Sequence, residues 1–221
     1  CYGCSHLWRT GKTRSSPTVT PVTGPVNHGE GPHWDHETGA LFFVDIQRGH
    51  GVSLVVPVAN SGARQILASR AHDIVVFDWD YENVTLAPPD DTSVKVVATV
   101  ETSSDKSGNR WNDGKADAKG RLWAGTMGPE PVVGEVTPDQ GSFYLLDQSN
   151  DFKAINEISP VSISNGLAWN KDNTALYYID TPTLTIARFD FDLEAGTICK
   201  YDSSETISMF NYTNIKNSIF I

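Results

Sequence analysis

Three stretches of the chain place an oxygen-bearing side chain directly before a glycine. They are Glu30, the pair Asn112-Asp113, and Asn165. A carboxylate and amide oxygens brought together from separate segments form an oxygen-only ligand set, which suits Ca²⁺ or Mg²⁺ and less readily Mn²⁺. Asn and Asp before Gly are also ordinary turn residues. The pattern therefore indicates either a divalent-cation site built mainly on Glu30, Asn112 and Asn165, or three turns of the same kind.

Basic residues lie close to two of these positions. Arg110 precedes Asn112 by two residues, so an extended backbone puts both side chains on one face. A guanidinium next to a cation site could hold a carboxylate or hydroxyl of a substrate, and a surface salt bridge is the alternative. His28 and His33 flank Glu30 without a partner at ligand spacing, and we interpret them as surface or loop histidines.

The elements that must position these residues read as β-strands. Short apolar runs, rich in β-branched and aromatic residues, are bounded by Gly, Pro, Asp or Asn. No stretch carries the apolar stripe of an amphipathic helix. The chain is therefore predicted to be all-β, and its clearest strands are 41–44, 52–56, 74–77, 94–97 and 176–179.

The strands belong to a repeated unit. A glycine, a polar turn and an aromatic strand recur from Gly31, Gly114 and Gly166, at separations of 83 and 52 residues. Since a propeller blade takes about 40–50 residues, these separations correspond to nearly two blades and to one. A β-propeller is favoured over a β-sandwich with similar hairpins. Equivalent positions on different blades meet at one end of the central channel, which would bring Glu30, Asn112 and Asn165 together.

Composition narrows the classes of function. Seventeen Lys and Arg against 27 Asp and Glu give a formal charge of −10, and such a surface repels nucleic acid. No window approaches 18 consecutive apolar residues, so no membrane partner is expected. No nucleophile elbow, phosphate-binding loop or dinucleotide fingerprint occurs. Without a signal peptide, the expected location is cytoplasmic.

Longer motifs surround the three glycine positions. They are Gly29-Glu30-Gly31-Pro32-His33-Trp34-Asp35, Asn109-Arg110-Trp111-Asn112-Asp113-Gly114-Lys115 and Ser164-Asn165-Gly166-Leu167-Ala168-Trp169. These motifs resemble the signature stretches of the SMP-30/gluconolactonase/luciferin-regenerating enzyme family. The chain is most similar to the regucalcin-like members of that family, in the insect branch. The resemblance covers roughly residues 26–201. It implies a six-bladed β-propeller that hydrolyses sugar lactones such as gluconolactone.

The resemblance also implies roles for individual residues. A single divalent cation, usually Ca²⁺ and alternatively Zn²⁺, Mn²⁺ or Mg²⁺, would be held by Glu30 and Asn165. Arg110, Asn112 and Glu130 match the substrate-binding positions. The expected partners are therefore a small-molecule sugar lactone and a divalent cation.

Two departures from the family pattern affect the expected activity. The family's remaining metal ligand is an Asp that also acts as the catalytic acid/base, in a Pro-Asp-Gly context beyond Asn165. This sequence has no Pro-Asp-Gly after Asn165. The segment between 45 and 52 also lacks room for a further strand. We therefore expect a truncated propeller of about four blades, with no catalytic residue of its own and no lactonase activity.

The expected organisation is an irregular leader over 1–25, a partial propeller over 26–201 and a divergent tail over 202–221. Two alternatives remain open for its role. The protein could be a non-enzymatic calcium-binding regulatory protein. An open propeller with unpaired strand edges could also have no stable function, because such edges invite aggregation.

Overall fold

The computed structural model describes residues 23–36, 38–46, 51–59, 65–79, 93–200 and 207–208. These residues form β-strands joined by turns and three short 3-10 helices, η3 (Ser104–Lys106), η4 (Gln148–Asn150) and η5 (Thr181–Thr183). The predicted all-β class is confirmed. Within the described ranges no helix is long and apolar enough to span a bilayer. The predicted leader and tail lie almost entirely outside the described residues.

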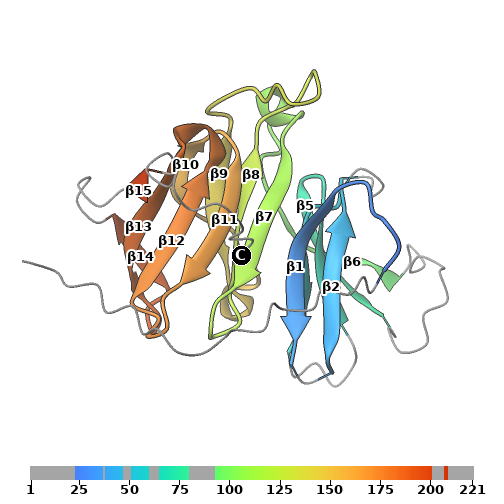
Figure 1. Cartoon of the computed structure of the whole chain (residues 1–221), viewed down its shortest axis with the longest axis vertical. Helices are drawn as coiled ribbons and strands as arrows, with labels where there is room; N and C mark the ends of the chain where they lie inside the picture. The colour runs from blue at the N-terminus through green and yellow to red at the C-terminus, as the bar shows by residue number, and fades with distance from the viewer. Residues whose placement is uncertain are drawn as a thin grey trace, which may run out of the picture.

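The described strands form four antiparallel sheets (Figure 1). The first pairs β1 (Gly29–Asp35) with β2 (Ala40–Asp45). The second sheet contains, in spatial order, β3 (Val55–Pro57), β4 (Gln65–Arg70), β5 (Asp73–Asp78) and β6 (Lys95–Thr99). The third contains β7 (Arg110–Ala116), β8 (Leu122–Met127), β9 (Gly141–Leu146) and β10 (Ile155–Val161). The fourth contains β11 (Ser164–Trp169), β12 (Ala175–Asp180), β13 (Thr185–Asp192) and β14 (Thr197–Lys200), and β15 (Ile207–Ser208) pairs with β13.

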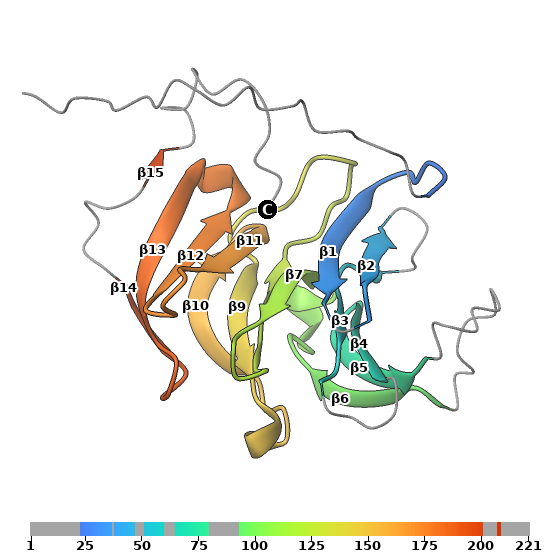
Figure 2. The ribbon, with the colours of Figure 1, turned by 60° about the horizontal axis from the view of Figure 1, so that its bottom comes forward.

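The sheets lie around a common centre, with β1, β3, β7 and β11 innermost (Figure 2). Each of these innermost strands is the first strand of its sheet in sequence. This is the arrangement of propeller blades, and it agrees with the predicted count of about four. The first sheet has two strands among the described residues.

One predicted strand is shorter in the structure. The run 52–56 was expected to be extended throughout, whereas β3 begins only at Val55. The reason is a side chain: the backbone N–H groups of Ser53 and Leu54 both donate to Ser69 Oγ, at 2.9 and 3.2 Å. A hydroxyl thus accepts these two N–H groups, while the Leu54 carbonyl still accepts from the Ser69 backbone N–H at 3.2 Å.

The core lies between neighbouring sheets. Alternate residues of β8 point to opposite faces, so Leu122 and Ala124 pack toward β3–β6 while Trp123 packs toward β11–β13. Tyr144 and Leu146 of β9 join the first cluster, and Phe143 and Leu145 join the second. The two middle strands of this sheet, β8 and β9, are therefore buried on both faces, and β7 pairs with β8.

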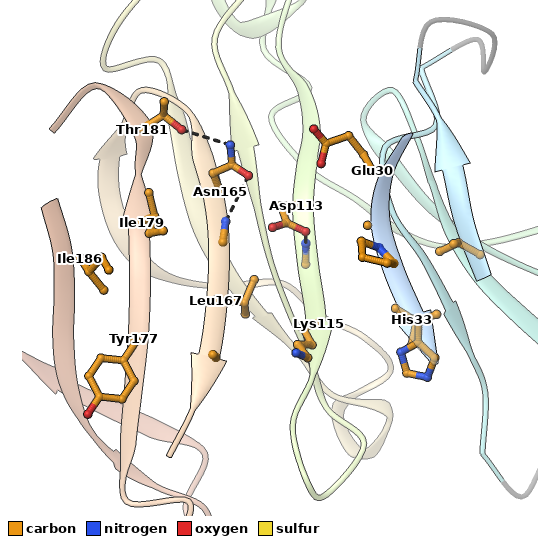
Figure 3. Close-up of a pocket in the computed structure, with 17 residues that line it drawn as sticks. Glu30, His33, Asp113, Lys115, Asn165, Leu167, Tyr177, Ile179, Thr181 and Ile186 are labelled. Carbon is orange, nitrogen blue, oxygen red and sulfur yellow. Dashed lines mark hydrogen bonds between the residues drawn. The ribbon is translucent and has the colours of Figure 1, made fainter. Parts of the chain in front are cut away.

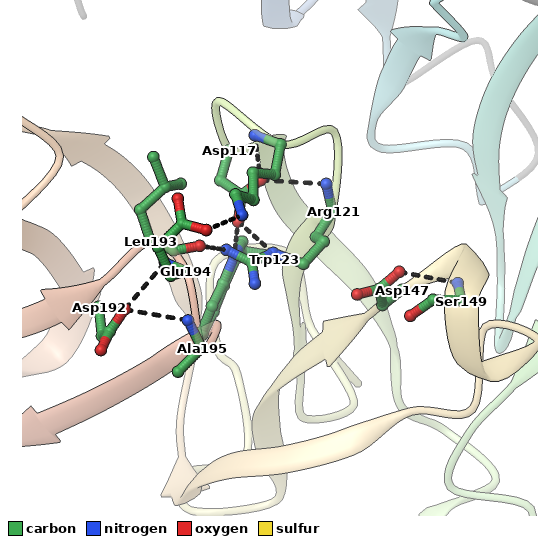
Figure 4. A network of polar contacts seen from close by, with 10 residues as sticks. Asp117, Arg121, Trp123, Asp147, Ser149, Asp192, Leu193, Glu194 and Ala195 are labelled. Carbon is green, nitrogen blue, oxygen red and sulfur yellow. Dashed lines mark hydrogen bonds and ion pairs between the residues drawn. The ribbon is translucent and has the colours of Figure 1, made fainter.

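A polar network joins the β7–β8 turn to the β13–β14 turn (Figure 4). Arg121 Nε donates to Asp117 Oδ2 at 2.7 Å, and Arg121 Nη2 donates to the Leu193 carbonyl at 2.7 Å. Trp123 Nε1 donates to the same Asp117 oxygen at 3.0 Å. The side chains of Asp117 and Arg121 are 0% and 7% exposed. This network, which we call the Asp117 network, fixes the third sheet against the fourth.

Candidate functional site

A cavity of about 530 Å³ opens where the innermost strands meet (Figure 3). Its size is typical of a small-molecule site. Four polar residues of the described chain gather at the end where the strands begin: Glu30 of β1, Asp113 of β7, Asn165 of β11 and Thr181 of η5. Its wall on β11–β13 is largely apolar and contains Leu167, Tyr177, Ile179 and Ile186.

A β-bulge lies at each of these three positions. The register shifts between Glu30 and His33 in β1, between Trp111 and Gly114 in β7, and between Asn165 and Leu167 in β11. A bulge re-aims the side chain that it carries. Gly31, with φ +56°, supplies the left-handed backbone that the first bulge requires. The repeated glycine of the sequence therefore marks a bulge that aims side chains into the channel.

Glu30 is exposed at the mouth of the cavity. Its Oε1 lies 3.1 Å from His28 Nε2, and its carboxylate points toward β7 in Figure 3. His28 is thus a neighbour of the candidate ligand and does not line the cavity. This position matches the sequence expectation that a carboxylate starts an inner strand.

Asp113 lies between Glu30 and Asn165. Its Oδ1 accepts a hydrogen bond from the Gly114 N–H at 2.8 Å. Burial raises the pKa of the Asp113 carboxyl, and the Glu30 carboxylate raises it further, although hydrogen bonds from the Gly114 and Gly166 N–H groups and the Lys115 charge oppose them. A carboxyl group with these surroundings is a typical functional-site residue, because its charge is left only partly compensated.

The amide of Asn165 is oriented by its neighbours. Its Nδ2 donates to Thr181 Oγ1 at 3.1 Å, and its Oδ1 accepts from the Gly166 N–H at 3.1 Å. Figure 3 shows the oxygen turned toward Asp113. A carbonyl-type oxygen keeps a second lone pair, so Asn165 presents an acceptor to the cavity.

Arg110 and Asn112 form a pair beside this group, as their spacing predicted. Arg110 Nη1 donates to Asn112 Oδ1 at 3.1 Å and to the Trp111 carbonyl at 3.1 Å. Asn112 Nδ2 donates across to the Ser164 carbonyl at 2.8 Å. The structure thus differs from the expected oxygen shell: Asn112 joins β7 to β11, and the adjacent Asp113 lines the cavity. The substrate-binding role of Asn112 stays a prediction.

Glu130 lies at the base of the β8–β9 loop and is exposed. Its Oε1 accepts from the Gly134 N–H at 2.6 Å. Burial lowers the pKa of Arg110 and the charge of Glu130 opposes this, which places the two side chains within electrostatic reach. Neither residue lines the cavity of Figure 3. They belong to a polar group next to it, and their predicted substrate contacts stay predictions.

Sequence reasoning missed several cavity residues, among them Asp113 and His33. Asp113 was visible beside Asn112, but a bulge that decides which of the two faces the channel leaves no mark in a single sequence. His33, interpreted as a surface or loop residue, lines the cavity and is partly buried. Among the residues that the structure describes, no three His, Cys, Asp or Glu side chains cluster closely enough to hold a metal ion by themselves.

Comparison with known proteins gives a consistent result. The model of the SMP-30/gluconolactonase/LRE-like family matches residues 28–211. Regucalcin of Macaca fascicularis is 33% identical over 185 residues, which cover 77% of this chain and 57% of that protein. The chain therefore spans somewhat more than half the length of this relative.

Two solved structures resemble the fold. A luciferin-regenerating enzyme is 34% identical, with a TM-score of 0.67 over 80% of this chain and 60% of that one. A regucalcin from Agrobacterium tumefaciens, described as a calcium-binding protein, is 22% identical, with a TM-score of 0.63 over 84% of this chain and 60% of that one. The second likeness bears on the fold alone.

Proposed function

The chain belongs to the SMP-30/gluconolactonase/LRE-like family, and from this premise we propose that it serves divalent-cation-dependent hydrolysis of a sugar lactone. The observation that carries the proposal is the meeting of oxygen donors from three sheets in one cavity: Glu30, Asp113 and Asn165. The preferred cation is Ca²⁺, with Zn²⁺, Mn²⁺ and Mg²⁺ as alternatives.

The donor set fits a hard cation in kind. Two carboxylates and one oriented amide oxygen are the ligand types that Ca²⁺ takes. Burial, with the Glu30 carboxylate adding to it, raises the pKa of Asp113, and a bound cation would oppose this shift. Glu30 and Asn165 would hold the cation, with Asp113 next to them. When bound, a divalent cation polarises a carbonyl and lowers the pKa of a coordinated water.

The other predicted residues would orient the lactone. Arg110 keeps several N–H donors beyond the one it gives to Asn112 and Trp111. Glu130 offers a second carboxylate oxygen as an acceptor for a sugar hydroxyl. Held in place by Asn112 and Gly134, these groups would align the ester carbonyl without losing further side-chain freedom on binding.

The cation site is tested by calcium titration of the protein. Glu30→Gln should weaken Ca²⁺ binding by about tenfold, because the ligand set loses one charge. The matched control is Asp172→Asn, which removes an exposed carboxylate from the β11–β12 turn and should leave the affinity unchanged. Equal affinity in Glu30→Gln and the unaltered protein would refute the site.

Proton transfer is a separate question. The family's acid/base Asp has no counterpart in a Pro-Asp-Gly context after Asn165. We infer that the 221 residues alone hydrolyse gluconolactone no faster than buffer containing the metal. A clear rate that is abolished by EDTA would overturn this inference while leaving the cation site in place.

A second candidate is a non-enzymatic calcium-binding regulatory protein. The ligand set of Glu30, Asp113 and Asn165 favours it, because binding needs only these oxygen donors and no proton carrier. A measurement of lactone binding distinguishes the two candidate functions. Ca²⁺ binding that gluconolactone leaves unchanged would favour the regulatory protein, whereas a lactone that binds only to the calcium-loaded protein would favour the hydrolase.

A further inference from the structure

The cavity combines a polar end with an apolar wall. Glu30, Asp113 and Asn165 lie where the inner strands begin, and the wall on β11–β13 starts directly beside them (Figure 3). Ile179 is the register partner of Asn165 between β12 and β11, so the two residues stand at the same level of the sheet. A ligand whose polar group reaches the proposed cation site therefore has this wall next to it.

Strand alternation leaves part of the wall uncovered. Tyr177 and Ile179 line the cavity about 6.6 Å apart along β12, while Tyr178 between them packs in the core. Ile186 of the adjacent β13 also lines the cavity. Tyr177, Ile179 and Ile186 are each only partly buried within the described chain. An apolar ligand would remove their uncovered surface from water, which is favourable.

Other sheets add apolar groups to the same cavity. Val55 and Val56 of β3, which are 7% and 8% exposed, line it together with Pro32 of β1. His33 of β1 and Lys115 of β7 provide polar groups beyond the polar end. A ligand in this cavity thus has polar partners along β1 and β7 and apolar contacts along β3 and β11–β13.

An unsubstituted sugar lactone does not match the wall. Its hydroxyl groups surround the ring, so some of them face the wall when the carbonyl lies next to Glu30 and Asn165. The hydroxyl group that the wall itself contains, that of Tyr177, points away from the polar end (Figure 3). A hydroxyl group that is buried without a partner is unfavourable. A methylene group buried at the same place is favourable.

We propose that the substrate of this cavity is a lactone that carries an alkyl substituent, which lies along Ile179 and Ile186 while the ester carbonyl lies at the polar end. The proposal rests on the proposed function for the reaction and for the place of the carbonyl, and it narrows the substrate class. In hydrolysis, water adds its oxygen to the carbonyl carbon, the ring carbon–oxygen bond breaks, and the ring oxygen becomes a hydroxyl group. The substituent takes no part in these steps and keeps its contacts with the wall.

The test compares two lactones that share one ring. The protein is titrated in the presence of EDTA with δ-decalactone, which has a pentyl substituent, and with δ-valerolactone, which has none. The amide signals of Gly166 and Ile179 in ¹H–¹⁵N NMR spectra report binding. δ-Decalactone should bind at least about tenfold more tightly, a factor that corresponds to about two buried methylene groups.

Substitutions in the wall test where the substituent lies. Ile186→Ser should lower the affinity for δ-decalactone about fivefold because apolar contact surface is lost, and Ile179→Ser should lower it similarly. Ile186→Val should keep most of the affinity. The matched control is Ile155→Ser, because Ile155 lies on β10, is 42% exposed and does not line the cavity. Unchanged circular dichroism of the variants would show that they fold.

The proposal would be refuted by equal affinities for the two lactones, by the absence of δ-decalactone binding, or by equal losses in Ile186→Ser and Ile155→Ser. The comparison of the two lactones in the unaltered protein needs no variant. Because the titration contains no metal, its outcome is independent of the calcium test. Loss of calcium binding with an intact preference for δ-decalactone would refute the cation site alone. Calcium binding without that preference would refute the alkyl substituent alone.

Discussion

Two carboxylates of the same hairpin have opposite surroundings. Asp117 accepts hydrogen bonds from Arg121 Nε, Trp123 Nε1 and the N–H groups of Lys119 and Arg121. Asp113, four residues earlier, has its pKa raised by burial and by the Glu30 carboxylate, against the hydrogen bonds of the Gly114 and Gly166 N–H groups. Hydrogen bonds within the protein compensate the charge of Asp117. The charge of Asp113 is compensated less completely, and its carboxylate is available to a ligand.

The difference teaches how one strand serves two purposes. A buried charge that is fully paired stabilises one arrangement of its neighbours, and losing one partner is costly. A partly buried charge that is poorly paired costs stability and persists where function needs it. The end of β7 near the β7–β8 turn therefore holds two sheets together, while its beginning presents a site. Substitutions should affect stability at Asp117 and binding at Asp113.

The largest expected effect is on stability, from Asp117→Asn. The amide cannot pair with the Arg121 guanidinium, which is left as an uncompensated buried charge, so the free energy of unfolding should fall by about 3–5 kcal/mol. Urea denaturation followed by tryptophan fluorescence measures it. Lys119→Gln is the control: it removes an exposed ion pair with Glu194 and should cost less than about 1 kcal/mol. Similar losses in both variants would contradict the assignment.

A substitution at Gly196 should disturb the same network from the other sheet. A methyl group at this position would overlap the Arg121 guanidinium, and the backbone has φ +68°. Gly196→Ala should therefore lower the free energy of unfolding by about 1–3 kcal/mol. The control is Gly120→Ala, which has φ +80° with open space around it. If both variants lose the same amount, backbone strain alone accounts for the loss.

Asp113→Asn should behave in the opposite way. It removes a poorly paired charge next to Glu30, so the free energy of unfolding should stay within about 1 kcal/mol of the unaltered protein, or rise. Calcium affinity should fall by about tenfold because one carboxylate leaves the site. Calorimetric titration and urea denaturation of the same sample measure both. A loss of stability as large as that of Asp117→Asn would remove the distinction between the two residues.

The smallest expected effect is a change of stability with pH, and it depends on the hydroxyl group of Tyr144. Burial, with the Glu101 carboxylate 3.1 Å from its hydroxyl, raises the pKa of Tyr144 to about 12. The folded state therefore holds this proton more tightly than the unfolded state, whose tyrosine has a pKa near ~10. The contribution of Tyr144 to stability is complete below about pH 10 and is lost as pH rises toward 12.

Absorbance of the tyrosinate ion during a pH titration measures this. The difference between the unaltered protein and Tyr144→Phe should contain no ionisation between pH 9 and about 11. Ionisation of Tyr144 near pH 10 would show that burial and the Glu101 carboxylate do not raise its pKa. The same two causes, burial and a neighbouring carboxylate, would then be a weaker explanation for the raised pKa of Asp113.

The sequence by itself determined the fold class and the family. Alternating apolar runs and the glycine-centred repeat predicted strands, blades and an inner position for Glu30 and Asn165, because local periodicity and turn chemistry act within a few residues. Arg110 and Asn112 were also predicted to share a face, and they do.

The tertiary structure decided the rest. The bulge in β7 selects Asp113 over Asn112 for the cavity, because a register shift depends on the partner strand β8. The short β3 results from the Ser69 hydroxyl of a neighbouring strand. His33 and Lys115 face one cavity only because β1 and β7 come from different sheets that meet at the centre. Such contacts join residues far apart in the chain, and no local pattern encodes them.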